Sequence, residues 1–137
     1  MEACRISPPF LVLMRRTRIL IVDDEPGLAR VLTLMLEKLN RYEVISVRDS
    51  SLALNQVVKF KPHLVLLDWV MPKMSGGDVA RQIRADSRVS RTPILVISAL
   101  VKERNGEGEF AGFPAISKPM GLNELVHGIE EQLRKAA

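Results

Sequence analysis

The sequence predicts a doubly wound α/β domain in which helices cover both faces of a five-stranded parallel sheet. The first observation is length, because 137 residues fit one domain with one core. The second is composition: 47% of the residues are hydrophobic and 26% are charged, as in ordinary globular proteins. The third is the alternation, from Arg18 onward, of short apolar runs with longer segments of helical period. We therefore expect residues 1–16 to form an N-terminal tail and residues 17–137 to form the domain.

The first part of the domain predicts two strands, each followed by a helix. The run RILIV (18–22) is continuously apolar, as expected of a strand covered on both faces. Pro26 suits the first turn of the next helix, whose apolar residues recur at steps of three and four: Leu28, Val31, Leu32, Met35, Leu36 and Leu39. YEVISV (42–47) predicts an edge-like second strand, and Asp49 or Ser50 can cap the helix that follows it.

The second part predicts three further strands and two clear helices. HLVLLD (63–68) is a buried third strand, and the turn-rich loop MPKMSGGD (71–78) opens a helix near Asp78. ILVIS (94–98) and FPAIS (113–117) predict the fourth and fifth strands. The last helix is predicted from apolar residues at helical spacing: Leu122, Leu125, Val126, Ile129 and Leu133.

The segment Val101–Phe113, VKERNGEGEFAGF, breaks this alternation. It contains three glycines and no apolar stripe, which leaves little to hold a full helix. We expect at most a turn or a short, frayed fourth helix there, with the remainder mobile.

Polar side chains follow four of the predicted strands: Asp23 and Asp24, then Asp68, Ser98 and Lys118. In an open parallel sheet, ligands bind beyond the carboxyl ends of the strands, so we expect these residues to converge. Clustered carboxylates raise each other's pKa unless a cation compensates them, and an all-oxygen site suits Mg²⁺. Lys118 and Ser98 would then surround a place for phosphoryl oxygens, with Asp68 as the nucleophile.

Four motifs occur in order: ILIVDDEPG, LVLLDWVMPKMSGGD, ILVISA and AISKPM. Together they resemble the successive signatures of the response-regulator receiver domain of two-component signalling, a CheY-like superfamily. The resemblance runs from about Arg18 to the C-terminus. It implies a flavodoxin-like sheet with strand order 2-1-3-4-5 and makes residues 17–137 a receiver domain.

The resemblance also implies a function. Asp68 would accept a phosphoryl group from the phosphohistidine of a sensor histidine kinase or phosphotransfer protein, while Asp23, Asp24, Asp68 and the backbone carbonyl of Val70 would hold magnesium. A further implication is that Ser98 and Lys118 would bind the phosphoryl group. Such a protein is a signalling domain rather than an enzyme with a separate substrate: it catalyses its own phosphorylation and dephosphorylation and switches partner binding. We expect no output domain in this chain.

One position departs from the pattern of this family. Receiver domains usually carry an aromatic residue three positions before the active-site lysine, and here that position is Ala115. Phe113 has the same strand parity and could take its place. We expect a monomer or weak dimer, with signalling carried by ordering of Val101–Phe113 when Ser98 moves toward the phosphoryl group.

Several function classes are disfavoured by composition. The net charge of +4 comes from scattered bases, so we expect no direct nucleic-acid binding. The run FLVLM (10–14) is too short for a membrane span and lacks a convincing signal-peptide cleavage site, so we expect a cytoplasmic protein. His63 and His127 stand alone, without zinc-site spacing.

Two alternative functions stay open at this point. One is a magnesium-dependent phosphatase with an aspartyl-phosphate intermediate, although such enzymes place an acid where this sequence has Val70. The other is a degenerate receiver that acts only as a docking module, an idea motivated by Ala115 and the glycine-rich segment.

Overall fold

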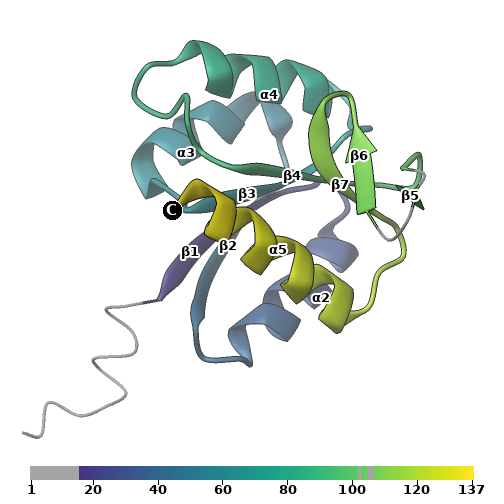
Figure 1. Cartoon of the computed structure of the whole chain (residues 1–137). Coiled ribbons are helices and arrows are strands. Elements are labelled where there is room, and N and C mark those ends of the chain that lie inside the picture. Colours follow the sequence, from purple (N-terminus) through teal and green to yellow (C-terminus); the bar gives the residue numbers. More distant parts are fainter. Residues whose placement is uncertain (1–15, 102, 105–106) are drawn as a thin grey trace, which may run out of the picture.

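The computed structural model describes residues 16–101, 103–104 and 107–137, and these form one layered α/β unit (Figure 1). The strands are β1 (Thr17–Val22), β2 (Tyr42–Val47), β3 (Leu64–Asp68), β4 (Ile94–Ser98), β5 (Glu103–Arg104), β6 (Glu107–Phe110) and β7 (Phe113–Ser117). The sheet order is β2-β1-β3-β4-β7-β6-β5, and its first five strands are parallel. The predicted doubly wound order 2-1-3-4-5 is therefore confirmed, with β7 as the fifth parallel strand.

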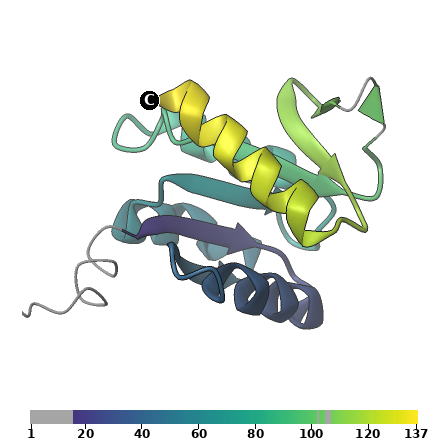
Figure 2. The same cartoon turned by 60° about the horizontal axis from the view of Figure 1, so that its bottom comes forward.

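The described helices are α2 (Pro26–Glu37), the short 3₁₀ helix η1 (Ser50–Leu52), α3 (Ala53–Phe60), α4 (Gly76–Ala85) and α5 (Leu122–Ala136). Helices α3 and α4 cover one face of the sheet, and α2 and α5 cover the other (Figure 1). Figure 2 brings the second face forward and shows α5 lying across the strands, with β6 and β7 at the far edge. This arrangement leaves the carboxyl ends of the parallel strands open between the two helix layers.

Alternation along the strands builds a separate core on each face of the sheet. In β1, Leu20 and Val22 pack toward α3 and α4, whereas Ile19 and Ile21 pack toward α2 and α5, and all four are fully buried. Burial on both faces is the reason why the central strands are continuous apolar runs. The strands are consequently rigid supports for the residues at their ends.

Between β4 and β7 we expected at most a turn or a short, frayed helix, but the described residues of this segment form no helix, so the expectation of a frayed helix was wrong. The described residues of that segment instead form β5 and β6, which pair in antiparallel fashion and extend the sheet beyond β7. A two-residue turn joins β6 to β7, with Ala111 at φ 54° and Gly112 at φ 87°, as in the mirror-image turns that suit hairpins. Gly112, one of the glycines that disfavour a helix, thus permits the hairpin turn. Residues 102 and 105–106 lie outside the described part.

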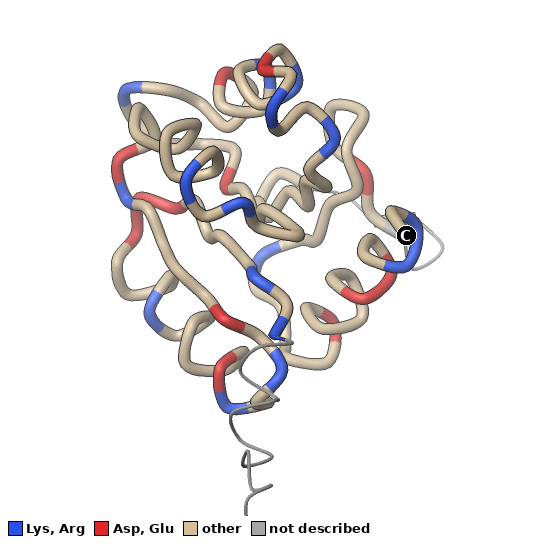
Figure 3. Tube along the Cα trace, turned by 90° about the vertical axis from the view of Figure 1, so that its left-hand side faces the viewer, with Lys and Arg blue, Asp and Glu red and all other residues tan. Residues whose placement is uncertain are grey.

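The N-terminal tail predicted for residues 1–16 lies almost entirely outside the described residues, so its boundaries stay a prediction. Over the described part, no helix is both long and apolar enough to cross a bilayer. Figure 3 shows lysines and arginines in several separate elements of the side that it presents, with acidic residues among them. This distribution agrees with the scattered charge inferred from the sequence.

Candidate functional site

Two buried carboxylates lie side by side at the carboxyl edge of the sheet. Strands β1 and β3 pair in parallel with Val22 opposite Leu67, so the next residues, Asp23 and Asp68, are neighbours. Asp23 is 0% exposed and Asp68 is 4% exposed. Buried ionised carboxylates are unfavourable without compensating charge, which makes this pair the electrostatic centre of the site.

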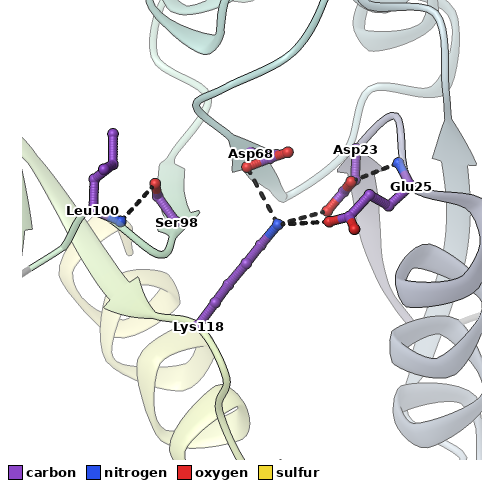
Figure 4. A network of polar contacts seen from close by, with 6 residues as sticks. All are labelled: Asp23, Glu25, Asp68, Ser98, Leu100 and Lys118. Atoms are coloured by element: carbon purple, nitrogen blue, oxygen red, sulfur yellow. Dashed lines mark hydrogen bonds and ion pairs between the residues drawn. The ribbon is translucent and has the colours of Figure 1, made fainter.

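Lys118 provides the compensating charge from β7, two strands away from β3 in the sheet (Figure 4). Its Nζ lies 3.3 Å from Asp68 Oδ1 and 3.4 Å from Asp23 Oδ2. The side chain is only 17% exposed, and a cis peptide bond follows it at Pro119. One ammonium group therefore bridges the ends of two neighbouring strands, and the structure brings together these three residues, which the sequence led us to expect at one edge of the sheet.

The third carboxylate of the cluster belongs to Glu25, which sequence reasoning did not assign to the site. Its Oε1 lies 3.3 Å from Lys118 Nζ, and its backbone N–H donates to Asp23 Oδ1 at 2.8 Å. Oxygens of Asp23, Glu25 and Asp68 all lie within 4.8 Å of one another. Glu25 is largely exposed, so its carboxylate contributes less to the local field than the two buried ones.

Asp24 does not join that oxygen cluster. It is half-buried and lines a hollow of about 380 Å³ together with Arg48, Asp49, Ser50 and Lys73. Its charge nevertheless raises the pKa of Asp68, so Asp24 lies near enough to act on that carboxyl electrostatically. Of the two consecutive aspartates, Asp23 thus joins the oxygen cluster, whereas Asp24 lines the neighbouring hollow.

The electrostatics of the site show an excess of negative charge. Burial, followed by the charge of Asp23, raises the pKa of Asp68 to about 6, although Lys118 opposes the shift. Burial also raises the pKa of Asp23 against the opposing effects of the Glu25 amide and Lys118. Burial lowers the pKa of Lys118, but the two aspartates outweigh it and the net shift is upward. The single ammonium group does not fully offset the burial of the two carboxylates and the repulsion between them.

Ser98 lies at the end of β4 and is 2% exposed. Its hydroxyl oxygen accepts a hydrogen bond from the Leu100 N–H at 3.1 Å and does not contact Lys118 (Figure 4). Its backbone carbonyl accepts from the N–H groups of Val101 at 3.4 Å and Lys118 at 3.1 Å. The residue therefore ties the beginning and the end of the β4–β7 connection to the site.

The loop after Asp68 is held by contacts that require small or polar residues at particular positions. A Cβ added to Gly76 would lie 2.5 Å from the Asp68 carbonyl oxygen, so no side chain fits there. Ser75 caps α4 through a capping box with Asp78. The buried Ser50 hydroxyl donates to the Pro72 carbonyl at 3.1 Å. In this loop Val70, two residues after Asp68, is 63% exposed.

The residues at this edge fit a magnesium ion. The donors are carboxylate oxygens, the hard ligands that Mg²⁺ prefers, and the raised pKa of Asp68 marks negative charge that a divalent ion would neutralise. The acidic cluster could thus bind a metal ion, in agreement with the magnesium expected from the sequence.

Comparison with known proteins identifies the family. A family model described as the response regulator receiver domain matches residues 19–130. The chain therefore belongs to the response regulator receiver domain family, whose members are phosphoacceptor domains of two-component signalling.

Similar proteins support this assignment. The chain is 36% identical over 127 residues to the DNA-binding response regulator MtrA of Mycolicibacterium smegmatis, covering 88% of this chain and 52% of that protein. It thus spans about half the length of the curated relatives it matches.

Among solved structures, a sensor protein from a Polaromonas species matches with a TM-score of 0.78 and 31% identity, covering 89% of this chain and 99% of that one. The receiver domain of a Pseudomonas aeruginosa sensor histidine kinase matches with a TM-score of 0.76 and 26% identity, covering 87% and 98%, and its structure has a magnesium ion coordinated in the active-site cleft.

Proposed function

We propose that Asp68 accepts a phosphoryl group from the phosphohistidine of a sensor histidine kinase or a phosphotransfer protein, and that the modified domain changes its affinity for a downstream protein. The observation that carries this proposal is the sharing of one cation, Lys118 Nζ, by the buried carboxylates of Asp23 and Asp68. A carboxylate held beside positive charge at the open end of a parallel sheet is suited to attack on phosphorus.

In the proposed transfer, a carboxylate oxygen of Asp68 bonds to phosphorus while the phosphorus–nitrogen bond of the donor breaks. The electron pair goes to the imidazole nitrogen, which takes up a proton from solvent. Asp68 needs no general base, because with a pKa of about 6 it is mostly ionised at neutral pH. The ammonium group of Lys118 and the hydroxyl group of Ser98 would donate hydrogen bonds to the phosphoryl oxygens.

We further propose that Asp23, Asp24, Asp68 and the backbone carbonyl of Val70 hold Mg²⁺. When bound, the ion would neutralise charge on the phosphoryl oxygens. The carboxylates of Asp23 and Asp68 supply the buried negative charge that attracts it. Glu25, with an oxygen in the same cluster, would add to that attraction from the exposed side.

The remaining parts of the proposal concern the setting in which the domain acts. We place its action in the cytoplasm, as a monomer or weak dimer that catalyses its own phosphorylation and dephosphorylation and makes no direct contact with nucleic acid. A phosphatase is less well supported, because the position two residues after Asp68 carries the exposed Val70 rather than an acid. A docking module without chemistry is less well supported, because the carboxylates of Asp23 and Asp68 both lie within ion-pair distance of the Lys118 ammonium group.

A small-molecule acyl phosphate tests the proposal. The protein is incubated with this phosphodonor and Mg²⁺, and the modified residue is located by peptide mapping in a mass spectrometer. We expect one phosphoryl group, on Asp68, and none on Asp68→Asn. Asp86→Asn is the matched control, because Asp86 pairs with Arg88 at the end of α4, away from the site. Labelling of another residue, or equal labelling of Asp68→Asn, would contradict the proposal.

A further inference from the structure

Trp69 connects the proposed acceptor directly to the β6–β7 hairpin. It follows Asp68 in the chain, and its ring centre lies 5.2 Å from that of Phe110, in an edge-on arrangement at 70°. The ring centre of Phe113 lies 6.2 Å away at 50°. Phe110 ends β6 and Phe113 begins β7, and the two are paired across the turn. Both sides of the hairpin turn therefore pack against the same indole ring.

The indole is also packed against the first turn of α4. A Cβ added to Gly77 would lie 3.0 Å from Cζ2 of the Trp69 ring, and one added to Gly76 would lie 2.7 Å from Trp69 Cα. The Gly76 N–H donates to the Trp69 carbonyl at 2.8 Å. Because Trp69 is closely packed on this side, a displacement at the end of β3 toward α4 is passed on to the first turn of that helix.

A second connection reaches the same hairpin through the backbone. The Ser98 carbonyl accepts hydrogen bonds from the N–H groups of Val101 and Lys118, which bracket β5, β6 and β7. Val101 is 5% exposed and belongs to the core on the α3 and α4 face. Movement of Ser98 toward a phosphoryl group would therefore pull on both ends of the connection that carries the hairpin.

The β6–β7 hairpin has two features of low intrinsic stability. Its two-residue turn places Ala111 at φ 54°, a left-handed conformation that disfavours residues with a Cβ. Strand β6 has four residues, and isolated short hairpins are marginal in water. An element of low intrinsic stability that is held by a few aromatic contacts is suited to respond to small changes at its neighbour.

We infer that Trp69, Phe110 and Phe113 form an aromatic clamp through which phosphorylation of Asp68 changes the stability of the β6–β7 hairpin. This inference rests on the proposed function and adds the route by which phosphorylation of Asp68 would reach the surface of the molecule. Ala115, which lies on β7 nearer to Lys118, has no side-chain rotamer to switch. The clamp lies on the same face of the sheet as Ala115, and its member Trp69 directly follows Asp68 in the chain.

The test is amide hydrogen exchange in the full chain, measured without modification and with Mg²⁺ and beryllofluoride, a mimic of the acyl phosphate. In the wild type, we expect exchange of the Gly108–Phe110 amides to change by about fivefold or more on modification. Phe110→Leu keeps apolar bulk but removes the ring, so its response should fall below about twofold while Asp68 is still phosphorylated by the acyl phosphate. Phe60→Leu is the control, because Phe60 packs on the same core away from Trp69.

The possible results separate this inference from the proposed function. If Asp68 is labelled but hairpin exchange is the same in both states, the clamp is wrong and the acceptor stands. A full response in Phe110→Leu also overturns the clamp, and Phe113→Leu serves as the second variant if Phe110→Leu does not fold. If wild-type Asp68 is never labelled, the proposed function fails, and the clamp is rejected with it because it has nothing to transmit.

Discussion

Replacing Asp68 with asparagine should stabilise the metal-free protein at neutral pH. The substitution keeps the size and shape of the side chain but removes one of two adjacent buried charges. Burial and the charge of Asp23 raise the pKa of Asp68 from 3.8 to about 6. The folded protein thus binds this proton more tightly than the unfolded chain, and ionisation of Asp68 opposes folding.

The size and sign of the effect follow from linkage. The stability associated with protonated Asp68 is fully present below pH 4 and is lost as the pH rises through about 6. The full difference corresponds to roughly 3 kcal/mol at pH 7, as an order of magnitude. The attraction of Lys118 is already included in this net shift, and we expect Asp68→Asn to be more stable than the wild type by about 1–3 kcal/mol.

Urea denaturation between pH 4 and pH 8, with a chelator present, measures the difference. Asp86→Asn is the matched control with the opposite sign, because hydrogen bonds from Arg88 lower the pKa of Asp86 to about 2. The stability that Asp86 contributes is present above pH 4 and is lost as the pH falls toward 2. A gap between Asp68→Asn and the wild type that does not grow between pH 4 and pH 7, or that has the reverse sign at pH 7, would refute the electrostatic reasoning.

Three further substitutions test the supports of the site, each by the free energy of unfolding in urea. Gly76→Ala forces a Cβ against the Asp68 carbonyl, so it should lower stability by about 2 kcal/mol or more and impair phosphorylation. A free energy of unfolding equal to that of the wild type would show that the loop shifts at little cost. Ala111→Gly should raise stability by about 0.5–1 kcal/mol by relieving the left-handed backbone, and a decrease would contradict the turn. Ser50→Ala removes a buried hydroxyl that donates to the Pro72 carbonyl and accepts from the Met74 N–H, and it should lower stability by about 1–2 kcal/mol, whereas no change would mean that solvent replaces the hydroxyl.

The parallel sheet could be predicted because each central strand is a short apolar run that ends in a polar residue. Residues 18–22 and 64–68 show this pattern clearly, and their pairing brings Asp23 beside Asp68. The rule that ligands bind at the carboxyl ends of parallel strands then gives the position of Lys118 without any coordinates. These features follow from burial on two faces and from strand direction, both of which are visible in a single sequence.

The hairpin could not be predicted, because its turn lacks the usual signal. Mirror-image two-residue turns are most often Asn-Gly or Asp-Gly, whereas here the turn is Ala111–Gly112. The strand is also supported by the tertiary contact of Phe110 with Trp69, which a single sequence does not show. The absence of a helical apolar stripe correctly disfavoured a full helix but did not indicate what would take its place.

The identity of the third carboxylate was also beyond sequence reasoning. Asp24 and Glu25 are consecutive, and only the course of the chain after β1 decides which of them meets Lys118. The Glu25 N–H donates to Asp23 Oδ1, and the side chain of Glu25 lies within 3.3 Å of the Lys118 ammonium. The spacing of residues in the sequence cannot predict which carboxylate meets Lys118, because the course of the turn depends on a side-chain hydrogen bond.

The most direct test of the account is the binding of Mg²⁺, followed by calorimetry and by the emission of Trp69. The central claim is that carboxylates from two strands share one divalent ion beside the acceptor. It predicts a single site in the wild type, with affinity lowered about tenfold or more in both Asp23→Asn and Asp68→Asn and unchanged in Asp86→Asn. A wild-type protein that binds no Mg²⁺, or one whose affinity survives both substitutions, would contradict it.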